Sequence, residues 1–121
     1  MFEGFLTQSI LARAVKKGAC RINMVDLREY GEGRWRKVDD KPYGGGPGML
    51  MKCAPWYKAV ESTLAGAKAG AGIRVVMTSP QGRRFTQRDA QDFSRCDRLV
   101  FMCGRYEGFD ARIEKLATDK F

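Results

Sequence analysis

Short β-branched runs alternate with segments of helical periodicity, and this alternation constrains the fold more than any other feature of the sequence. Residues 73–77 and 99–103 are the clearest runs; each is apolar and short, and a loop containing glycine follows each one. A helix is predicted between them over residues 87–94, because Thr86 and Asp89 have capping-box spacing. Strands that alternate with helices form a parallel sheet covered on both faces. The sequence therefore predicts an α/β fold.

The remaining elements are predicted from the same periodicities. Apolar side chains at helical spacing predict a helix over residues 2–17, which Gly18 ends as a C-cap. Alternation over residues 20–26 predicts a further strand. A second helix is expected with Pro55 in its first turn, and a last helix contains Ile113.

A long segment without periodicity, residues 27–52, contains a block rich in glycine and proline at 42–49. Loops of this length are uncommon in a small domain unless they are functional or disordered. The block lacks the Gly-Lys-Ser/Thr ending of a P-loop, but successive glycines let a flat ligand such as a base approach the main chain. Basic residues surround Trp35 over residues 34–41 and favour RNA as the ligand, since bases stack on aromatic rings. A plain flexible loop is the alternative.

The composition excludes several classes of chemistry. The chain has no histidine, so histidine-dependent nucleophilic relays, a histidine general base and histidine-ligated zinc are excluded within it. Its four cysteines lack C-x-x-C spacing, and we expect them to be reduced, buried thiols. The net charge of +8 attracts polyanions, although a solvated basic surface would give the same charge. Without a long apolar run or a secretory signal, a single soluble domain in the cytoplasm is expected.

Two loops, residues 78–82 and 104–108, follow consecutive predicted strands. Ligands of parallel sheets bind beyond the carboxyl ends of the strands, so a site is expected where these loops meet. In the second loop, glycines flank Tyr106 and Glu107. The aromatic ring could stack on an adenine-like ring, and the carboxylate could accept a hydrogen bond from a ribose hydroxyl or an ammonium group. The alternative is that Tyr106 packs in the protein and Glu107 is solvated at a helix start.

Three motifs, taken in order and at their separation, resemble the bacterial tRNA (guanine-N1)-methyltransferases, the TrmD family. These motifs are residues 37–49, 79–82 and 103–110, and the resemblance covers nearly the whole chain. It implies a SPOUT-class α/β fold, with a parallel sheet, flanking helices and a deep trefoil knot. It also implies a homodimer that transfers a methyl group from S-adenosylmethionine to N1 of the guanine 3′ of the anticodon in tRNA. Magnesium is a further implied cofactor, and neither DNA nor a membrane is an expected partner.

The resemblance assigns binding roles motif by motif. The cofactor pocket would be lined by Thr78, Ser79, Pro80, Gly104, Tyr106 and Glu107. The target base would lie near Pro42, Tyr43, Gly44, Gly45, Gly46, Pro47 and Gly48, with Asp39 and Asp40 helping to hold that loop. The family's general-base aspartate and its partner arginine belong to a segment beyond Phe121. No residue of this chain is therefore predicted to be catalytic or to bind a metal.

The resemblance also implies family segments on both sides of this chain. Members have one more strand before the helix that here starts at Phe2. After the position of Phe121 they continue into a knot-closing segment and a helical, tRNA-binding C-terminal domain. We therefore expect residues 1–121 to be a partial cofactor-binding SPOUT domain that is catalytically silent alone. The alternatives are a non-catalytic basic RNA-binding module and, more weakly, a nucleotide-phosphate binder.

Overall fold

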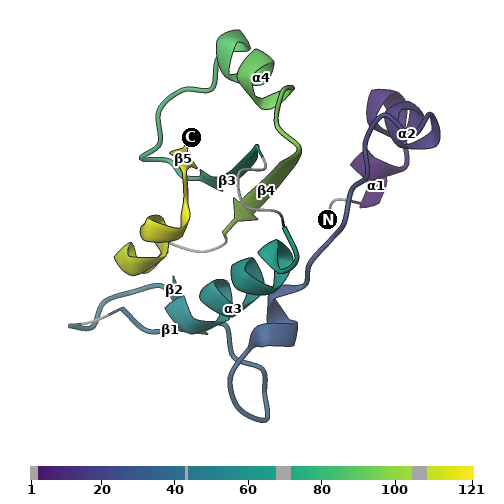
Figure 1. Cartoon of the computed structure of the whole chain (residues 1–121). Helices are drawn as coiled ribbons and strands as arrows, with labels where there is room; N and C mark the ends of the chain where they lie inside the picture. Colours follow the sequence, from purple (N-terminus) through teal and green to yellow (C-terminus); the bar gives the residue numbers. More distant parts are fainter. Residues whose placement is uncertain (1–2, 43, 68–71, 105–108) are drawn as a thin grey trace.

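A three-stranded parallel sheet lies at the centre of the computed structural model of this chain (Figure 1). The structure describes residues 3–42, 44–67, 72–104 and 109–121. Strand β3 (Ile73–Thr78) lies between β4 (Arg98–Cys103) and β5 (Asp119–Lys120), and both neighbours are parallel to it. The predicted α/β architecture and its two main strands are thus confirmed, whereas β5 was not predicted.

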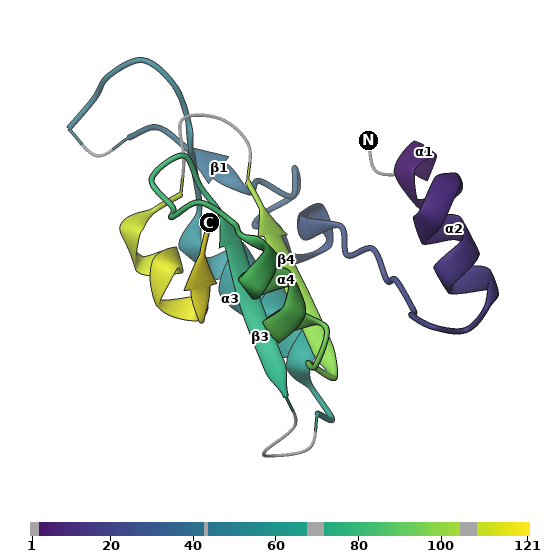
Figure 2. The same ribbon diagram turned by 90° about the horizontal axis from the view of Figure 1, so that it is seen from above.

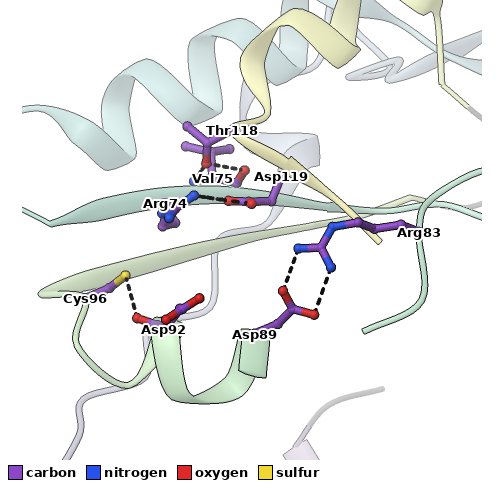
Figure 3. A network of polar contacts seen from close by, with 8 residues as sticks. All are labelled: Arg74, Val75, Arg83, Asp89, Asp92, Cys96, Thr118 and Asp119. Atoms are coloured by element: carbon purple, nitrogen blue, oxygen red, sulfur yellow. Dashed lines mark hydrogen bonds and ion pairs between the residues drawn. The ribbon is translucent and has the colours of Figure 1, made fainter. Parts of the chain in front are cut away.

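Strand β5 is short, but several contacts hold it against β3. Thr118, just before β5, donates from its backbone N–H to the Val75 carbonyl over 2.8 Å, and its hydroxyl accepts from the Val75 N–H over 2.8 Å. Arg74 and Asp119 form an ion pair at 3.0 Å between the two strands (Figure 3). These contacts fix the register of β5, in which Val76 lies opposite Asp119.

Helices cover the two faces of the sheet. Helix α3 (Cys53–Leu64) lies on one side and α4 (Gln87–Phe93) on the other, as both views show (Figures 1 and 2). The predicted capping box is present in α4, where the Thr86 hydroxyl accepts from the Asp89 N–H and the Asp89 carboxylate accepts from the Thr86 N–H. The predicted last helix is a 3₁₀ helix, η2 (Ala111–Leu116).

The hydrophobic core lies mainly between α3 and the sheet. Its buried members come from α3, both long strands, η2 and the short strand β2 (Leu50–Met51): Met51, Trp56, Val60, Val75, Met77, Met102 and Ile113. Full burial of an aliphatic side chain such as Ile113 stabilises a fold by about 1.5–3 kcal/mol. Among the described residues, no helix combines the length and apolar composition that crossing a membrane requires.

The N-terminal helix is broken into α1 (Glu3–Leu6) and α2 (Ser9–Lys16), and Phe2 lies outside the described residues. Helix α2 ends as predicted, because Gly18 adopts φ +71° and its N–H donates to the Val15 carbonyl. No residue of α2 is buried, and both views place α1 and α2 apart from the sheet (Figures 1 and 2).

The strand predicted over residues 20–26 is wrong. The segment has no strand assignment, and every one of its side chains is exposed, including those of Ile22 and Met24. An alternating pattern becomes a strand only where a neighbour accepts its hydrogen bonds and covers its apolar face. Within the described part of the chain, no strand pairs with this segment.

The segment predicted as a loop, residues 27–52, contains short regular elements. A 3₁₀ helix, η1 (Leu27–Tyr30), comes first, and the Tyr30 hydroxyl donates to the Ser62 hydroxyl of α3 over 3.0 Å. Strands β1 (Asp39–Asp40) and β2 (Leu50–Met51) then pair in antiparallel fashion. The glycine block is therefore part of the connection of a hairpin rather than of an unstructured segment.

Candidate functional site

The carboxyl ends of β3 and β4 meet at one edge of the sheet. Thr78 lies opposite Cys103 in the register, so the chain leaves both strands at the same level, toward Ser79 and toward Gly104. The Thr78 hydroxyl donates to the Met102 carbonyl over 3.3 Å and ties the two strand ends together. The expected edge is thus formed by Thr78, Ser79, Pro80 and Gly104. The other predicted cofactor residues, Tyr106 and Glu107, lie outside the described residues.

The turn after β3 is held by Ser79. Its carbonyl accepts from the Gly82 N–H over 2.9 Å, and its hydroxyl accepts from the Gln81 N–H over 3.2 Å. Pro80 is exposed within this turn. Among the described residues of this edge, Thr78 and Ser79 offer hydroxyl and backbone groups, which can form hydrogen bonds with a purine and its ribose.

The same turn contacts the last residue of the chain. The Ser79 N–H donates to the Phe121 carbonyl over 2.6 Å, and the Phe121 N–H donates to the Met77 carbonyl over 2.9 Å. A Cβ atom on Gly82 would overlap the backbone of Phe121. The close packing against Phe121 therefore requires glycine at this position. Backbone conformation does not require it, because the φ of Gly82 lies outside the left-handed region.

An ion pair beside this turn was missed by the sequence analysis. Arg83 donates to both carboxylate oxygens of Asp89, over 2.9 and 2.5 Å (Figure 3). Its guanidinium lies 4.2 Å from the centre of the Phe121 ring. This pairing and the bonds from Thr86 hold the pKa of Asp89 well below its usual range, and the pKa of Arg83 is raised. Arg83 thus has a carboxylate partner in α4.

Phe109 connects the third motif to the end of the glycine block. A Cβ on Gly104 would overlap the Phe109 ring, so this ring packs directly on the glycine. Phe109 also forms a parallel bridge with Met51 and packs edge-on against Trp56 at 5.4 Å between ring centres. Next to it, Arg112 hydrogen bonds to Asp110 and lowers the pKa of that carboxyl to about 2.

The glycine block shows the backbone freedom that its composition predicts. Gly44, Gly45, Gly46 and Gly48 all have positive φ, and residues 44–48, including Pro47, are exposed. No atom lies within 4 Å of a Cβ built on Gly44, Gly45 or Gly46, so these glycines serve the backbone conformation rather than packing. The Gly45 N–H donates to the Pro42 carbonyl over 3.2 Å. Tyr43 lies outside the described residues.

The residues expected to hold this block lie at its base. Asp39 and Asp40 form β1, opposite Met51 and Leu50 of β2. The Asp40 carboxylate accepts from the Lys41 N–H over 2.8 Å at the start of the connection. These two aspartates thus occupy the strand from which the block begins.

The cysteines are free, but they are not all buried as expected. Cys20 and Cys103 are exposed, while Cys53 and Cys96 are half-buried. Burial raises the pKa of the Cys53 thiol. In the described ranges, no group of three or more Cys, Asp or Glu residues could hold a metal ion.

Comparison with known proteins assigns the chain to a family. A family model described as "tRNA (Guanine-1)-methyltransferase TrmD" matches residues 1–121. The chain belongs to the TrmD family. It is 46% identical to the tRNA (guanine-N(1)-)-methyltransferases of Geobacillus kaustophilus and Bacillus subtilis, over 99% of its own length and 48% and 49% of theirs. It therefore spans about half the length of these TrmD relatives.

A solved TrmD structure has the same fold. The crystal structure of tRNA (m1G37) methyltransferase from Aquifex aeolicus matches with a TM-score of 0.83 at 33% identity, over 97% of this chain and 51% of that one. The resemblance stated from the three motifs and the fold class that it implied are thereby confirmed.

Proposed function

We propose that the protein containing this chain transfers a methyl group from S-adenosylmethionine to N1 of the guanine 3′ of the anticodon in tRNA. The match of the TrmD family model to residues 1–121 carries this proposal. The register that places Thr78 beside Cys103 supports it, because it brings the ends of two family motifs to one sheet edge. In the cell we expect a cytoplasmic homodimer.

The cofactor would be held by the two loops at this edge, through Thr78, Ser79, Pro80, Gly104, Tyr106 and Glu107. Pro80 and Gly104 are exposed at this edge, and the hydroxyl and backbone groups of Thr78 and Ser79 suit the adenosyl part of the cofactor. When bound, S-adenosylmethionine supplies an electrophilic methyl group, so the protein needs no nucleophile of its own. Its residues need to align the guanine and provide for removal of the N1 proton.

The target base would lie near the glycine block, at Pro42, Tyr43, Gly44, Gly45, Gly46, Pro47 and Gly48. Their open backbone allows close approach of a flat base. By the family resemblance, the general base and its partner arginine lie outside the motifs that this chain matches, so we assign no catalytic role to residues 1–121. A magnesium requirement remains a prediction, with no residue assigned to it.

The expected trefoil knot stays a prediction. Ser79, Gly82 and Arg83 contact the last two residues, Lys120 and Phe121, through backbone bonds and close packing. The turn after β3 and the end of β5 are therefore in contact in this structure.

A methylation assay tests the proposed reaction. The gene, including any coding sequence that flanks this segment, is expressed and supplied with radiolabelled S-adenosylmethionine and tRNA. We expect label in tRNA that has guanine 3′ of the anticodon and none when adenine replaces it. Label that does not depend on this base would refute the assignment. The purified 121-residue chain should give no label, and detectable methylation by it would refute its catalytic silence.

A pair of glycine variants tests the role of the glycine block. Gly45 and Gly66 have similar φ, +79° and +75°, with nothing within 4 Å of either Cβ position, but only Gly45 lies in the block. Both alanine variants therefore carry a similar backbone strain of about 1–2 kcal/mol. In the methylating protein, Gly45→Ala should raise the KM for tRNA or lower kcat, while Gly66→Ala leaves both unchanged. Equal effects of the two variants would show that the glycine block is not part of the substrate site.

A second candidate function is a non-catalytic RNA-binding module. Exposed basic residues around the exposed Trp35 favour it. It predicts RNA binding that weakens steeply with salt and no affinity for S-adenosylmethionine. Calorimetric titration of the protein expressed from the whole gene with S-adenosylmethionine separates the two functions, because only the methyltransferase binds it.

A further inference from the structure

A basic hairpin, residues 31–37, has a fixed shape. Glu32 and Lys37 exchange two backbone hydrogen bonds of 2.9 Å, as an antiparallel pair. The Arg36 N–H donates to the Gly33 carbonyl over 3.1 Å and closes a four-residue turn. Arg34 and Trp35 therefore occupy the two central positions of this turn, at the tip of the hairpin.

The base of the basic hairpin is anchored to the body of the protein. Glu32 forms an ion pair with Lys52, which lowers the pKa of the Glu32 carboxyl. The Lys52 N–H donates to the Val38 carbonyl over 2.8 Å, directly before helix α3 begins at Cys53. A Cβ on Gly31 would overlap the Arg36 carbonyl, so the two arms of the hairpin are in close contact. The tip is thus held on an anchored base.

The tip presents an indole ring to solvent. Trp35 is 79% exposed, whereas the only other tryptophan, Trp56, is 8% exposed. The Arg34 guanidinium lies 5.7 Å from the centre of the Trp35 ring, a cation–π distance. At the tip, both the exposed ring and the neighbouring guanidinium are accessible, so Trp35 is available for stacking on a flat ligand.

Unpaired positive charge surrounds this ring. Arg34, Arg36 and Lys37 are all exposed, and among the described residues none of them forms an ion pair. A protein partner would favour a broader apolar patch, whereas a single aromatic ring among cations matches a base between phosphates.

We propose that Trp35 stacks on an unpaired base of single-stranded RNA while Arg34, Arg36 and Lys37 contact the neighbouring phosphates. The proposal rests on the proposed function for its RNA substrate. It adds a stacking contact of Trp35, which lies outside the three family motifs and the cofactor edge. Stacking suits a loop of the RNA rather than its paired stem, because bases in a duplex already stack on one another.

Fluorescence tests the contact directly, because Trp35 is one of two tryptophans. In a Trp56→Phe chain, all tryptophan emission comes from Trp35. Titration with an RNA hairpin should quench this emission, and a fully paired RNA of equal length should quench it much less. If Trp56→Phe does not fold, the difference in emission between wild type and Trp35→Phe supplies the same signal.

Affinity measurements on variants complete the test. Trp35→Ala should weaken binding of the RNA hairpin by about tenfold, and Trp35→Phe should recover most of it. Met24→Ala, which removes another exposed apolar side chain, should have no effect. Each substitution of Arg34, Arg36 or Lys37 by glutamine should lower the salt dependence of log K by about 0.7 for each phosphate that the original side chain neutralises.

The outcomes separate this proposal from the proposed function. Unchanged affinity in Trp35→Ala, or RNA binding without quenching, overturns the stacking contact even where the methylation assay succeeds. If the Trp35 emission instead changes with protein concentration in the absence of RNA, Trp35 contacts another copy of the protein. This result would also overturn the stacking contact. Failure of methylation, with Trp35-dependent RNA binding intact, would overturn the reaction and leave the contact standing.

Discussion

Gly82 shows how a single residue can hold the candidate cofactor turn against the end of the chain. Its Cβ position is filled by the Phe121 backbone, so any side chain would displace strand β5 or the turn. Gly82→Ala should lower the free energy of unfolding by about 1–3 kcal/mol, the usual effect of overpacking. Urea denaturation measures this. Gly4→Ala is the control, since nothing lies within 4 Å of that site and alanine favours a helix. Equal stability of the two variants would show that Gly82 does not contact Phe121.

The thiols differ in exposure, which predicts their order of reaction. Cys20 and Cys103 are exposed, while Cys53 is half-buried and its pKa is raised by that burial. Because the thiolate is the reactive species, alkylation near neutral pH should label Cys20 and Cys103 before Cys53. Peptide mapping after short exposures to iodoacetamide measures this order. Early labelling of Cys53 would show that the start of α3 opens readily.

Residue roles were predictable from the sequence where they depend on short spacing. The role of Asp89 in the capping box follows from its distance to Thr86 along the chain. Its pairing with Arg83 does not, because a residue in an irregular turn has no fixed direction relative to the following helix. The packing of Phe121 on Gly82 is less predictable still, since it joins segments far apart in the sequence.

At the scale of elements, local patterns predicted those that contain their own signals. β3 and β4 are mainly apolar, with Arg74 and Arg98 as their charged residues, and α4 begins with a capping box. Strand β5 is only two residues long, and it is a strand because it pairs with the edge of β3 that β4 does not occupy. No local sequence pattern therefore identifies it. Residues 20–26 show the opposite case, in which the pattern is present but no described strand pairs with it.

The 3₁₀ helix η2 gives a prediction about pH. Asp110 is its N-cap and accepts from the Arg112 N–H over 3.0 Å, and Arg112 lowers the pKa of Asp110 from 3.8 to about 2. A carboxyl whose pKa is lowered by folding stabilises the fold above about pH 4, and this contribution is lost as the pH falls toward 2. NMR titration of the Asp110 carboxyl carbon should therefore give a midpoint near 2.

A residue-specific measurement is needed because the pKa values of Glu32 and Asp89 are also lowered. Asp110→Asn serves as the control: it keeps an oxygen that can accept from the Arg112 N–H, and it removes the titration. A midpoint near 3.8 would show that the pair with Arg112 does not persist in solution.

At the scale of the whole molecule, the sheet and the N-terminal helices differ in how they are held. β3 is paired on both sides and contributes Val75, Val76 and Met77 to the buried residues. Helix α2 buries no residue, and Ile10 is 70% exposed on it. The order of strands and helices predicts the sheet, but it carries no information on whether a helix packs against that sheet. This part of the architecture therefore could not be derived from periodicity.

This difference predicts where the chain opens first. Local opening requires little free energy where little apolar surface is uncovered, and up to the full unfolding free energy in the core. Brief trypsin digestion should cut at Lys16, Lys17 and Arg21 well before Arg74 and Arg98, which lie in β3 and β4. Mass spectrometry of the early fragments identifies the sites. A chain lacking residues 1–21 should keep the urea midpoint of the full chain, because α2 adds no buried side chain. Simultaneous cleavage at the N-terminal and sheet sites, or a lower midpoint after truncation, would show that the N-terminal helices pack against the sheet in solution.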